Sequence, residues 1–190
     1  MNLIIFGPPG AGKGTQSKFI VKNYNLFQLS TGEILRNEIR NKTELGIKIF
    51  SIMNSGTLVS DEIVSNLIEK FISKKEYKNR FIFDGYPRNL NQAKNLDDLL
   101  GKYEQKIDIV LKLSVSLETV KKRITERRAL ERRPDDTKEI AIKRFETYEK
   151  STKPVIEYYK KLNLLKVVNG ESSIDEINTE ISGLIDLIEG

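Results

Sequence analysis

A glycine-rich stretch with a single lysine follows the first apolar segment of the chain. It reads GPPGAGKGTQ, from Gly7 to Gln16, and comes directly after the apolar run Leu3 to Phe6. Closely spaced glycines let the backbone turn tightly and point successive N–H groups at a negative ligand. The spacing of Gly7, Gly12 and Lys13 predicts a phosphate-binding loop, in which the lysine reaches the outer phosphates and the next helix offers its positive end.

An acid and an arginine follow another apolar run. In FIFDGYPR, from Phe81 to Arg88, Asp84 stands where the apolar residues end. A carboxylate there suits Mg²⁺ held through water, although it could also serve as a helix cap or a turn residue. We expect the magnesium role, because a phosphate loop requires a cation. Thr15 is a second candidate ligand, one place later than the usual hydroxyl. Arg88 could grip an anion with two guanidinium nitrogens.

Basic residues gather in the segment KKRITERRALERRPDD, from Lys121 to Asp136. Such a segment can be a solvated helix face, but Arg123 and Arg127 are four residues apart and would share one side of a helix. Arg133 and Arg144 follow further along the chain. If the segment folds over the phosphate loop, these four guanidinium groups would converge on one polyphosphate and stabilise the charge that develops during phosphoryl transfer.

The composition excludes several kinds of chemistry. The 190 residues are 38% hydrophobic and 31% charged, which is typical of a soluble globular domain. The chain has no cysteine and no histidine, so we expect no structural zinc and no Ser–His or Cys–His nucleophile pair. No apolar run is long enough to span a membrane and no signal segment is evident, so we expect a cytoplasmic protein without membrane association. A net charge of +5 is mild for a nucleic-acid binder.

Apolar segments that could form strands alternate with segments of helical periodicity. The strand candidates are LIIF (3–6), FQL (27–29), RFIFD (80–84), DIVLKL (108–113) and LLKVV (164–168). This alternation predicts a parallel sheet with helices on both faces. Two intervals break it: residues 30–59, where only helical patterns occur, and the basic segment. Both would emerge at the carboxyl ends of strands, where open α/β sheets place their ligands.

Together, these motifs resemble those of adenylate kinases in the nucleoside monophosphate kinase family. The matching stretches are GPPGAGKGTQ (7–16), STGEILR (30–36), GTLVSDE (56–62), FDGYPRNLNQA (83–93) and RRPDD (132–136), in the order of the family. The resemblance spans essentially the whole chain and includes the threonine displaced by Gly14. It implies an α/β P-loop fold of three layers with a central parallel sheet of five strands.

The same resemblance implies three parts within a single kinase domain. The core would comprise residues 1–29, 60–125 and 137–190. Residues 30–59 would form a helical AMP-binding lobe, and residues 126–136 a short lid without the extra sheet of longer family members.

The resemblance also implies roles for individual residues. The ATP-binding residues would be Gly10, Ala11, Gly12, Lys13, Gly14, Thr15, Arg127 and Ser172, the last of these beside Asn169 and Gly170 in a loop around the adenine. The AMP-binding residues would be Thr31, Arg36, Thr57, Leu58, Val59, Gly85, Tyr86, Pro87, Arg88, Gln92, Arg133 and Arg144. The catalytic cations would be Lys13, Arg88, Arg123, Arg127, Arg133 and Arg144.

The reaction implied is reversible phosphoryl transfer from MgATP to AMP, giving two ADP, by a monomer that maintains adenine nucleotide levels. UMP/CMP kinases of the same fold are an alternative, but they typically carry alanine at the position of Thr31 and asparagine at that of Gln92, so these two residues favour AMP. A binding protein that holds RNA on its basic segment is an alternative from another class. That segment lacks interleaved aromatic residues and ends in two acids, which disfavours RNA.

Overall fold

The computed structural model describes residues 1–131 and 137–189 and has a single parallel sheet in that part of the chain. The strands are β1 (Leu3–Phe6), β2 (Phe27–Ser30), β3 (Phe81–Asp84), β4 (Ile109–Ser114) and β5 (Leu165–Asn169). The helices are α1 (Lys13–Tyr24), α2 (Thr31–Arg40), α3 (Glu44–Asn54), α4 (Asp61–Ile72), α5 (Leu90–Lys102), α6 (Leu117–Glu131), α7 (Lys138–Lys161) and α8 (Ile174–Glu189), with a short 3-10 helix at Lys75–Tyr77. The five predicted strand segments are confirmed.

The sheet has the strand order β2-β3-β1-β4-β5, so the first strand of the chain is its centre. Leu3 lies opposite Ile82 of β3 on one side and Ile109 of β4 on the other. Every residue of β1 and β3 is buried. A parallel strand covered on both faces needs an uninterrupted apolar run, which is why LIIF and FIF show no alternation with polar residues.

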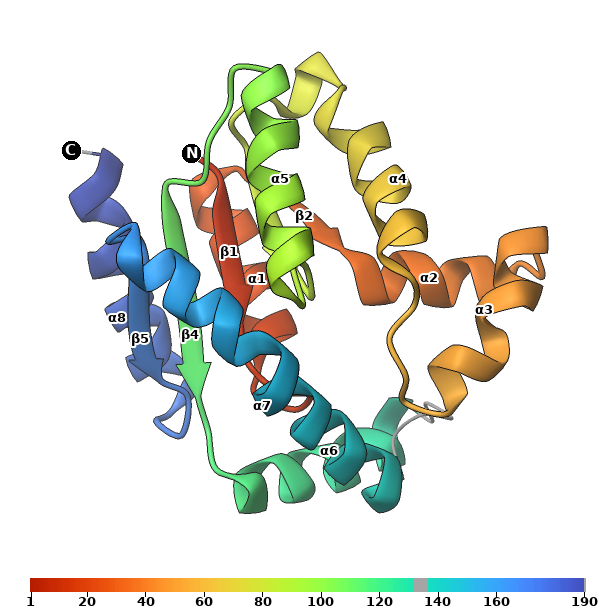
Figure 1. Ribbon diagram of the computed structural model, residues 1–190. Coiled ribbons are helices and arrows are strands. Elements are labelled where there is room, and N and C mark those ends of the chain that lie inside the picture. Colours follow the sequence, from red (N-terminus) through yellow and green to blue (C-terminus); the bar gives the residue numbers. More distant parts are fainter. Residues whose placement is uncertain (132–136, 190) are drawn as a thin grey trace.

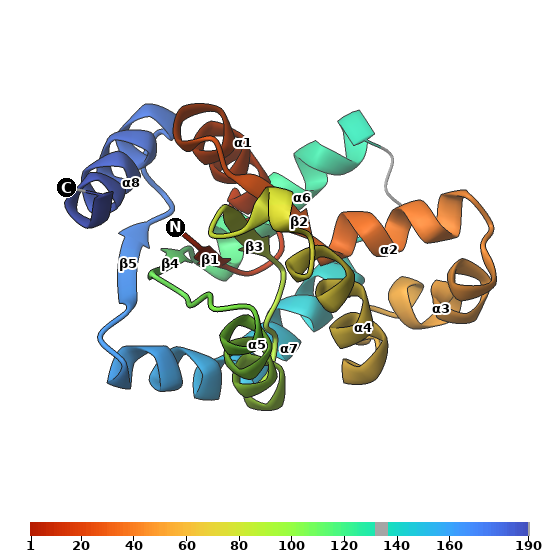
Figure 2. The ribbon, with the colours of Figure 1, turned by 90° about the horizontal axis from the view of Figure 1, so that it is seen from above.

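Helices cover both faces of the sheet and make a three-layer α/β fold. Helices α1 and α8 lie on one face, whereas α5 and α7 lie on the other (Figures 1 and 2). The buried side chains form two main clusters accordingly. One includes Leu3, Ile20 and Ile181 under α1 and α8, and the other includes Phe83 and Leu96 under α4, α5 and α7. The predicted fold class is confirmed.

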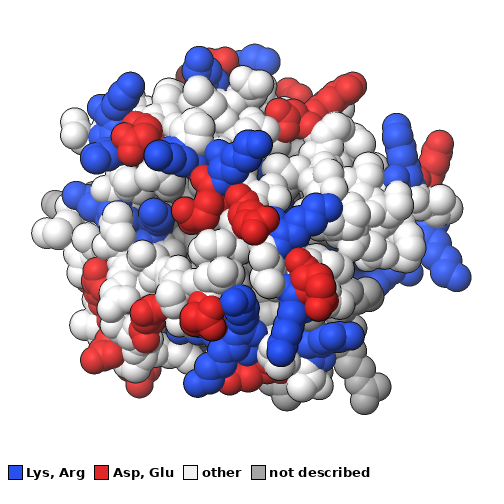
Figure 3. Space-filling model, turned by 60° about the horizontal axis from the view of Figure 1, so that its bottom comes forward, with Lys and Arg blue, Asp and Glu red and all other residues white. Residues whose placement is uncertain are grey.

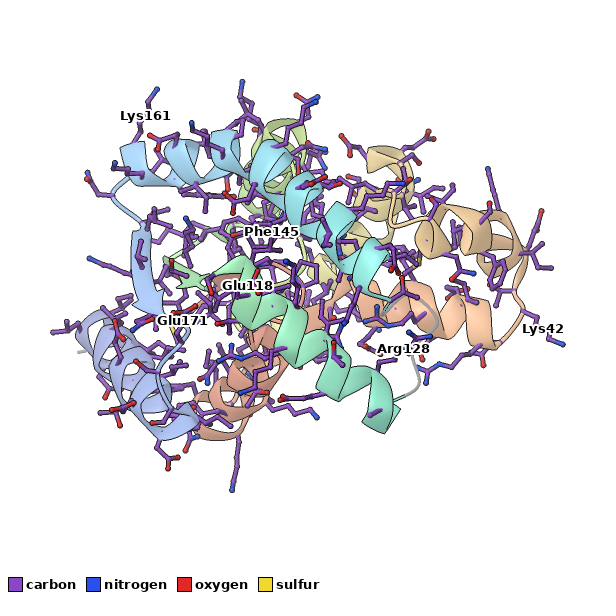
Figure 4. The ribbon with its side chains drawn as sticks, turned by 90° about the horizontal axis from the view of Figure 1, so that it is seen from below. Lys42, Glu118, Arg128, Phe145, Lys161 and Glu171 are labelled. Atoms are coloured by element: carbon purple, nitrogen blue, oxygen red, sulfur yellow. The ribbon has the colours of Figure 1, made fainter. Side chains whose placement is uncertain are left out.

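Two pairs of helices project from the carboxyl edge of the sheet. Helices α2 and α3 extend away to one side (Figure 2), and a Cβ on Gly46 of α3 would lie 2.1 Å from the carbonyl oxygen of Glu38 in α2, so glycine permits their close contact. Helices α6 and α7 lie side by side, and Phe145 of α7 packs with Val120 and Ile124 of α6 (Figure 4). The segment 30–59 indeed contains helices, and both projecting pairs border the predicted phosphate loop.

Candidate active site

The glycine-rich stretch forms the turn between β1 and α1. Gly10 and Gly12 have φ angles of +81° and +94°, in the left-handed region that side chains rarely adopt. Helix α1 begins at Lys13, and no side chain caps its N-terminus. The loop and the first residues of α1 line a large cleft, so the N–H groups at this helix end can receive an anion there.

Lys13 folds back over the loop. Its Nζ donates hydrogen bonds to the carbonyl oxygens of Gly7, at 2.6 Å, and Pro8, at 3.1 Å. The pKa of Lys13 is lowered from 10.5 to about 8, mainly by burial. Asp84 opposes this shift, whereas Arg88, Arg144 and Arg127 add to it. A lysine surrounded by other cations in a cleft marks a place suited to a multiply charged anion.

Asp84 lies at the carboxyl end of β3 and is only 8% exposed. Its neighbour in the adjacent strand is Ile5 of β1, so the carboxylate stands beside the start of the phosphate loop. Its Oδ2 accepts a hydrogen bond from Nε2 of Gln28, at 3.1 Å. Thr15 is exposed and lines the same cleft. Both predicted metal candidates therefore border one cavity, although only Asp84 is buried.

Among the described residues, five arginines from four parts of the chain line the cleft. They are Arg36, Arg88, Arg123, Arg127 and Arg144. Burial lowers the pKa of the Arg88 guanidinium to about 10, with Arg144 as the next cause, and its Nε donates to the carbonyl oxygen of Gly85 at 2.7 Å. Arg36 is paired with Glu33, its Nη2 lying 2.5 Å from Oε1. Of the predicted cations, Arg133 lies outside the described residues.

Arg123 joins two loops at the edge of the sheet. It donates from Nη1 to the carbonyl oxygen of Ala11, at 3.2 Å, and from Nη2 to that of Gly170, at 2.9 Å. Beside it lies Glu171 (Figure 4), which accepts hydrogen bonds from the backbone N–H of Ser116 and the hydroxyl of Thr119. Hydrogen bonding by Ser116, through its side chain and its backbone, and then by Thr119 lowers the pKa of Glu171 to about 2. The phosphate loop, the start of α6 and the loop after β5 are thereby fixed relative to one another.

The described residues predicted for AMP, apart from Tyr86, line the same cleft. Thr31, 2% exposed, donates its hydroxyl proton to the carbonyl oxygen of Gly85 at 3.0 Å, which leaves its lone pairs for a ligand. Gln92 is held by the backbone N–H of Arg88 and by Asp61. Tyr86 differs from the rest of the predicted set, because its side chain is buried and does not line the cleft.

The cleft has a volume of about 1130 Å³ and brings the two predicted sets of residues together. Of the described residues that were predicted for the site, all line it except Tyr86 and the two adenine-loop residues Asn169 and Gly170. Arg133 is not described. It is also lined by side chains that the sequence analysis did not single out: Gln28, Leu35, Met53, Val64, Tyr148, Ser151, Thr152 and Ile174. Tyr148 and Thr152 recur at helical spacing from Arg144 along α7, a signal that could have revealed them.

Three further features would indicate other kinds of site: a metal site formed by acidic side chains, a membrane-spanning helix and a uniformly basic surface. Within the described residues, no three acidic side chains gather where they could hold a metal ion, and no helix is both long and apolar enough to cross a membrane. Figure 3 shows acidic side chains interspersed among lysines and arginines on the face beneath the sheet, so that face is not a uniformly positive surface. Arg128, on α6, is exposed (Figure 4).

Comparison with known proteins gives consistent matches along the chain. Residues 5–164 match the family model described as adenylate kinase. The chain is 42% identical over 211 aligned positions to an adenylate kinase of Pelagibacter ubique, covering 97% of this chain and 99% of that protein. It is 44% identical over 179 positions to one of Prochlorococcus marinus, covering 94% and 95%. With one of Caulobacter it shares 41% identity over 188 positions, covering 99% of this chain and all of the relative.

Proposed function

Because this chain belongs to the adenylate kinase family, we propose that it catalyses reversible transfer of the γ-phosphoryl group from MgATP to AMP, giving two ADP. The observation that carries the proposal is the gathering of Lys13, Arg88, Arg127 and Arg144 at one cleft, where each arginine lowers the pKa of the lysine. Mutual repulsion of these cations costs folding free energy, and a polyphosphate that enters the cleft would relieve it.

The two nucleotides would occupy opposite ends of the cleft. The ATP phosphates would lie over the loop from Gly10 to Thr15, contacted by Arg127, with the adenine toward Ser172. The AMP base would lie near Thr31 and Gln92, and its phosphate near Arg36, Arg88 and Arg144. The backbone of residues 57–59 and 85–87 would complete the AMP side, with Tyr86 supporting that backbone from the core. The shared lining of one cavity supports this division.

Transfer would proceed in line between the two phosphates. The bond from the γ-phosphorus to an AMP phosphate oxygen forms as the bond to the β–γ bridging oxygen breaks, and ADP leaves with the electron pair. The AMP oxygen is already anionic, so no general base is needed, in agreement with a chain that has no histidine. Lys13 would leave the carbonyls of Gly7 and Pro8 for the transferred group, and the arginines would hold both phosphates and stabilise the charge between them.

Mg²⁺ would be held at Asp84, with Thr15 as the second candidate. The donor set fits this ion, because Mg²⁺ is usually held by one or two carboxylates together with waters and substrate phosphates rather than by a cage of protein ligands. Gln28 occupies Oδ2 of Asp84, which leaves Oδ1 for a metal-bound water. When bound, Mg²⁺ would neutralise charge on the transferring phosphate oxygens.

Closure over the nucleotides would exclude water, because water in the site would hydrolyse ATP. The division proposed from the sequence is kept: a core of residues 1–29, 60–125 and 137–190, an AMP-binding lobe of residues 30–59, and a lid of residues 126–136. Lid motion in adenylate kinases is a standard example of such closure. We expect a monomer that acts on ATP, AMP and ADP in the cytoplasm, and size-exclusion chromatography checks the oligomeric state.

Acceptor-dependent ADP formation tests the proposed function. Purified protein is mixed with Mg²⁺ and ATP, and AMP, CMP, UMP or GMP is added in separate reactions. We expect rapid ADP formation in the reaction that contains AMP and not in those that contain CMP, UMP or GMP. Faster turnover with CMP or UMP would keep the mechanism but make the chain a pyrimidine nucleotide kinase. No acceptor-dependent ADP would overturn the proposal.

A further inference from the structure

A network of hydrogen bonds behind the AMP side of the cleft fixes the side-chain amide of Gln92. This side chain is 3% exposed, and its Oε1 accepts from the backbone N–H of Arg88 at 2.7 Å. Its Nε2 donates to Oδ1 of Asp61 at 2.7 Å. Asp61 belongs to the first turn of α4 and does not line the cleft, whereas Gln92 does.

The two partners fix the orientation of the Gln92 amide, with its oxygen toward Arg88 and its nitrogen toward Asp61. A backbone N–H can only donate and an ionised carboxylate can only accept, so a Gln92 amide turned by 180° would face an N–H with its NH₂ group and a carboxylate with its oxygen. Both hydrogen bonds would become repulsive contacts in a buried place, where unpaired polar groups are costly.

Asp61 is itself held in position. Nδ2 of Asn89 donates to both carboxylate oxygens, at 2.9 and 3.1 Å, and Oδ1 of the same asparagine accepts from the backbone N–H of Gln92 at 2.9 Å. The start of α5 and the start of α4 are therefore tied together through three side chains. Because Asn89 holds both carboxylate oxygens, Asp61 cannot reorient to accommodate a Gln92 amide that has turned.

A fixed amide presents a fixed order of donor and acceptor to a base. One lone pair of Oε1 and one N–H of Nε2 remain for a ligand after the bonds to Arg88 and Asp61 are made. This pair matches adenine, whose 6-amino group donates and whose N1 accepts. Hypoxanthine has the reverse order, because O6 accepts and N1–H donates, and guanine shares that reversed edge. A glutamine able to turn could pair with either kind of base.

We propose that Asp61 is a positioning residue for base selection, which holds the Gln92 amide in the one orientation that pairs with 6-aminopurines and thereby rejects 6-oxopurine nucleotides. This inference rests on the proposed function, since it takes Gln92 to face the base of the acceptor nucleotide. The cost of rejecting the reversed edge comes from Asp61, a residue of α4 that does not itself line the cleft.

The substitution Asp61→Asn tests the proposal, because an asparagine amide can donate to a turned Gln92 while its oxygen still accepts from Asn89. We expect the ratio of kcat/KM for AMP to that for IMP to fall by about tenfold, the usual scale for one hydrogen bond to a charged group. Glu62→Gln is the matched control: it removes an exposed acid from the same helix turn, and the ratio should stay at the wild-type value. An equal loss of activity with both acceptors would assign Asp61 a purely structural role and overturn the proposal.

A measurement without nucleotide separates this inference from the proposed function. The side-chain amide resonances of Gln92 in ¹⁵N-labelled protein should shift in Asp61→Asn and remain in place in Glu62→Gln. If they do not respond to Asp61→Asn, the network does not fix the amide and the inference fails, even if AMP is a substrate. If Asp61→Asn does not fold, Asp61→Leu gives the same comparison, with a smaller expected fall in the AMP-to-IMP ratio because leucine cannot donate to a turned amide. If wild type does not use AMP, the proposed function fails while the amide resonances still report on the network.

Discussion

Gln28 of β2 donates a hydrogen bond to Asp84 of β3 at 3.1 Å, across two strands that pair in register between Ser30 and Asp84. The bond restrains a carboxylate that lines the cleft. Groups that orient a metal-binding carboxylate commonly contribute about tenfold or more to metal affinity, and less when water intervenes. We expect Gln28→Leu to weaken Mn²⁺ binding in the presence of ATP by roughly two- to tenfold.

Electron paramagnetic resonance of Mn²⁺ measures this effect independently of turnover. Asn66→Leu, on α4 and away from the cleft lining, serves as a control for a comparable polar-to-apolar change. An unchanged Mn²⁺ affinity in Gln28→Leu would show that the hydrogen bond does not serve the metal.

Removal of the Lys13 ammonium should lower the turnover rate far more than it weakens AMP binding. Lys13 belongs to the ATP end of the cleft, and its ammonium is the group placed to stabilise charge on the transferred phosphate. Lys13→Met should lower kcat by roughly 10²–10³-fold, the range found for loss of one preorganised donor, while calorimetry should give AMP affinity close to wild type. Equal losses of kcat and AMP affinity would contradict the role, and Lys22→Met in the last turn of α1 is the control for a lysine removed elsewhere.

The lowered pKa of Lys13 predicts a pH dependence of stability. In the folded protein the ammonium loses its proton near pH 8, whereas in the unfolded chain it keeps the proton up to about 10.5. The unfolded chain binds more protons between these values, so the free energy of unfolding of wild type should rise with pH there, relative to Lys13→Met. The change should be on the order of 1–3 kcal/mol.

Urea unfolding of both proteins at pH 7.5 and at pH 10 measures that difference, and the shared pH effects of other groups cancel. Lys22→Met keeps Lys13 and removes an exposed lysine, so the difference between wild type and Lys22→Met should stay constant over this range. A constant difference between wild type and Lys13→Met across this range would mean that burial and the neighbouring arginines do not lower the pKa of Lys13 in the folded protein.

Base preference should depend on Thr31 and Gln92 together. Thr31→Ala combined with Gln92→Asn should lower the preference for AMP over CMP by roughly ten- to hundredfold, because a purine then leaves buried polar groups unpaired. Steady-state kinetics with both acceptors measure the ratio. Should the double variant keep the wild-type ratio, the selection of AMP must reside elsewhere in the cleft.

Two helical glycines should respond oppositely to alanine. A Cβ on Gly46 would lie 2.1 Å from the carbonyl oxygen of Glu38, so Gly46→Ala must separate α2 from α3 and should destabilise the protein by at least about 2 kcal/mol. A Cβ on Gly183 of α8 would meet no atom within 4 Å, so Gly183→Ala should stabilise by up to about 1 kcal/mol. Thermal unfolding distinguishes the two, and a neutral Gly46→Ala would mean that α2 and α3 pack more loosely than described.

The sequence predicts features that are encoded locally. The strands are uninterrupted apolar runs, the phosphate loop is a contiguous motif, and the helical segments show their periodicity, so each could be predicted without knowledge of its neighbours. The contact of Gln28 with Asp84 joins residues far apart in the chain, and so does that of Asp61 with Gln92. Such pairs depend on how the strands and helices are arranged, which no local pattern specifies.

Arg123 illustrates the same limit within a predicted site. Its position on a helix face near the loop could be expected from spacing, but its bonds to Ala11 and Gly170 could not. These carbonyls belong to two loops that only the strand order brings together. Tyr86 belongs to a stretch that the resemblance assigns to AMP as a whole, and the motif could not indicate that its ring is buried in the core.

The central position of β1 sets the order in which the protein can assemble during synthesis. Strand β1 leaves the ribosome before the two strands that pair with it, which contain Ile82 and Ile109. At usual rates of translation, roughly 5–20 s separate the emergence of Leu3 from that of Ile109. During that interval the LIIF segment lacks one or both of its neighbouring strands, so its apolar side chains and backbone polar groups cannot yet make all their native contacts.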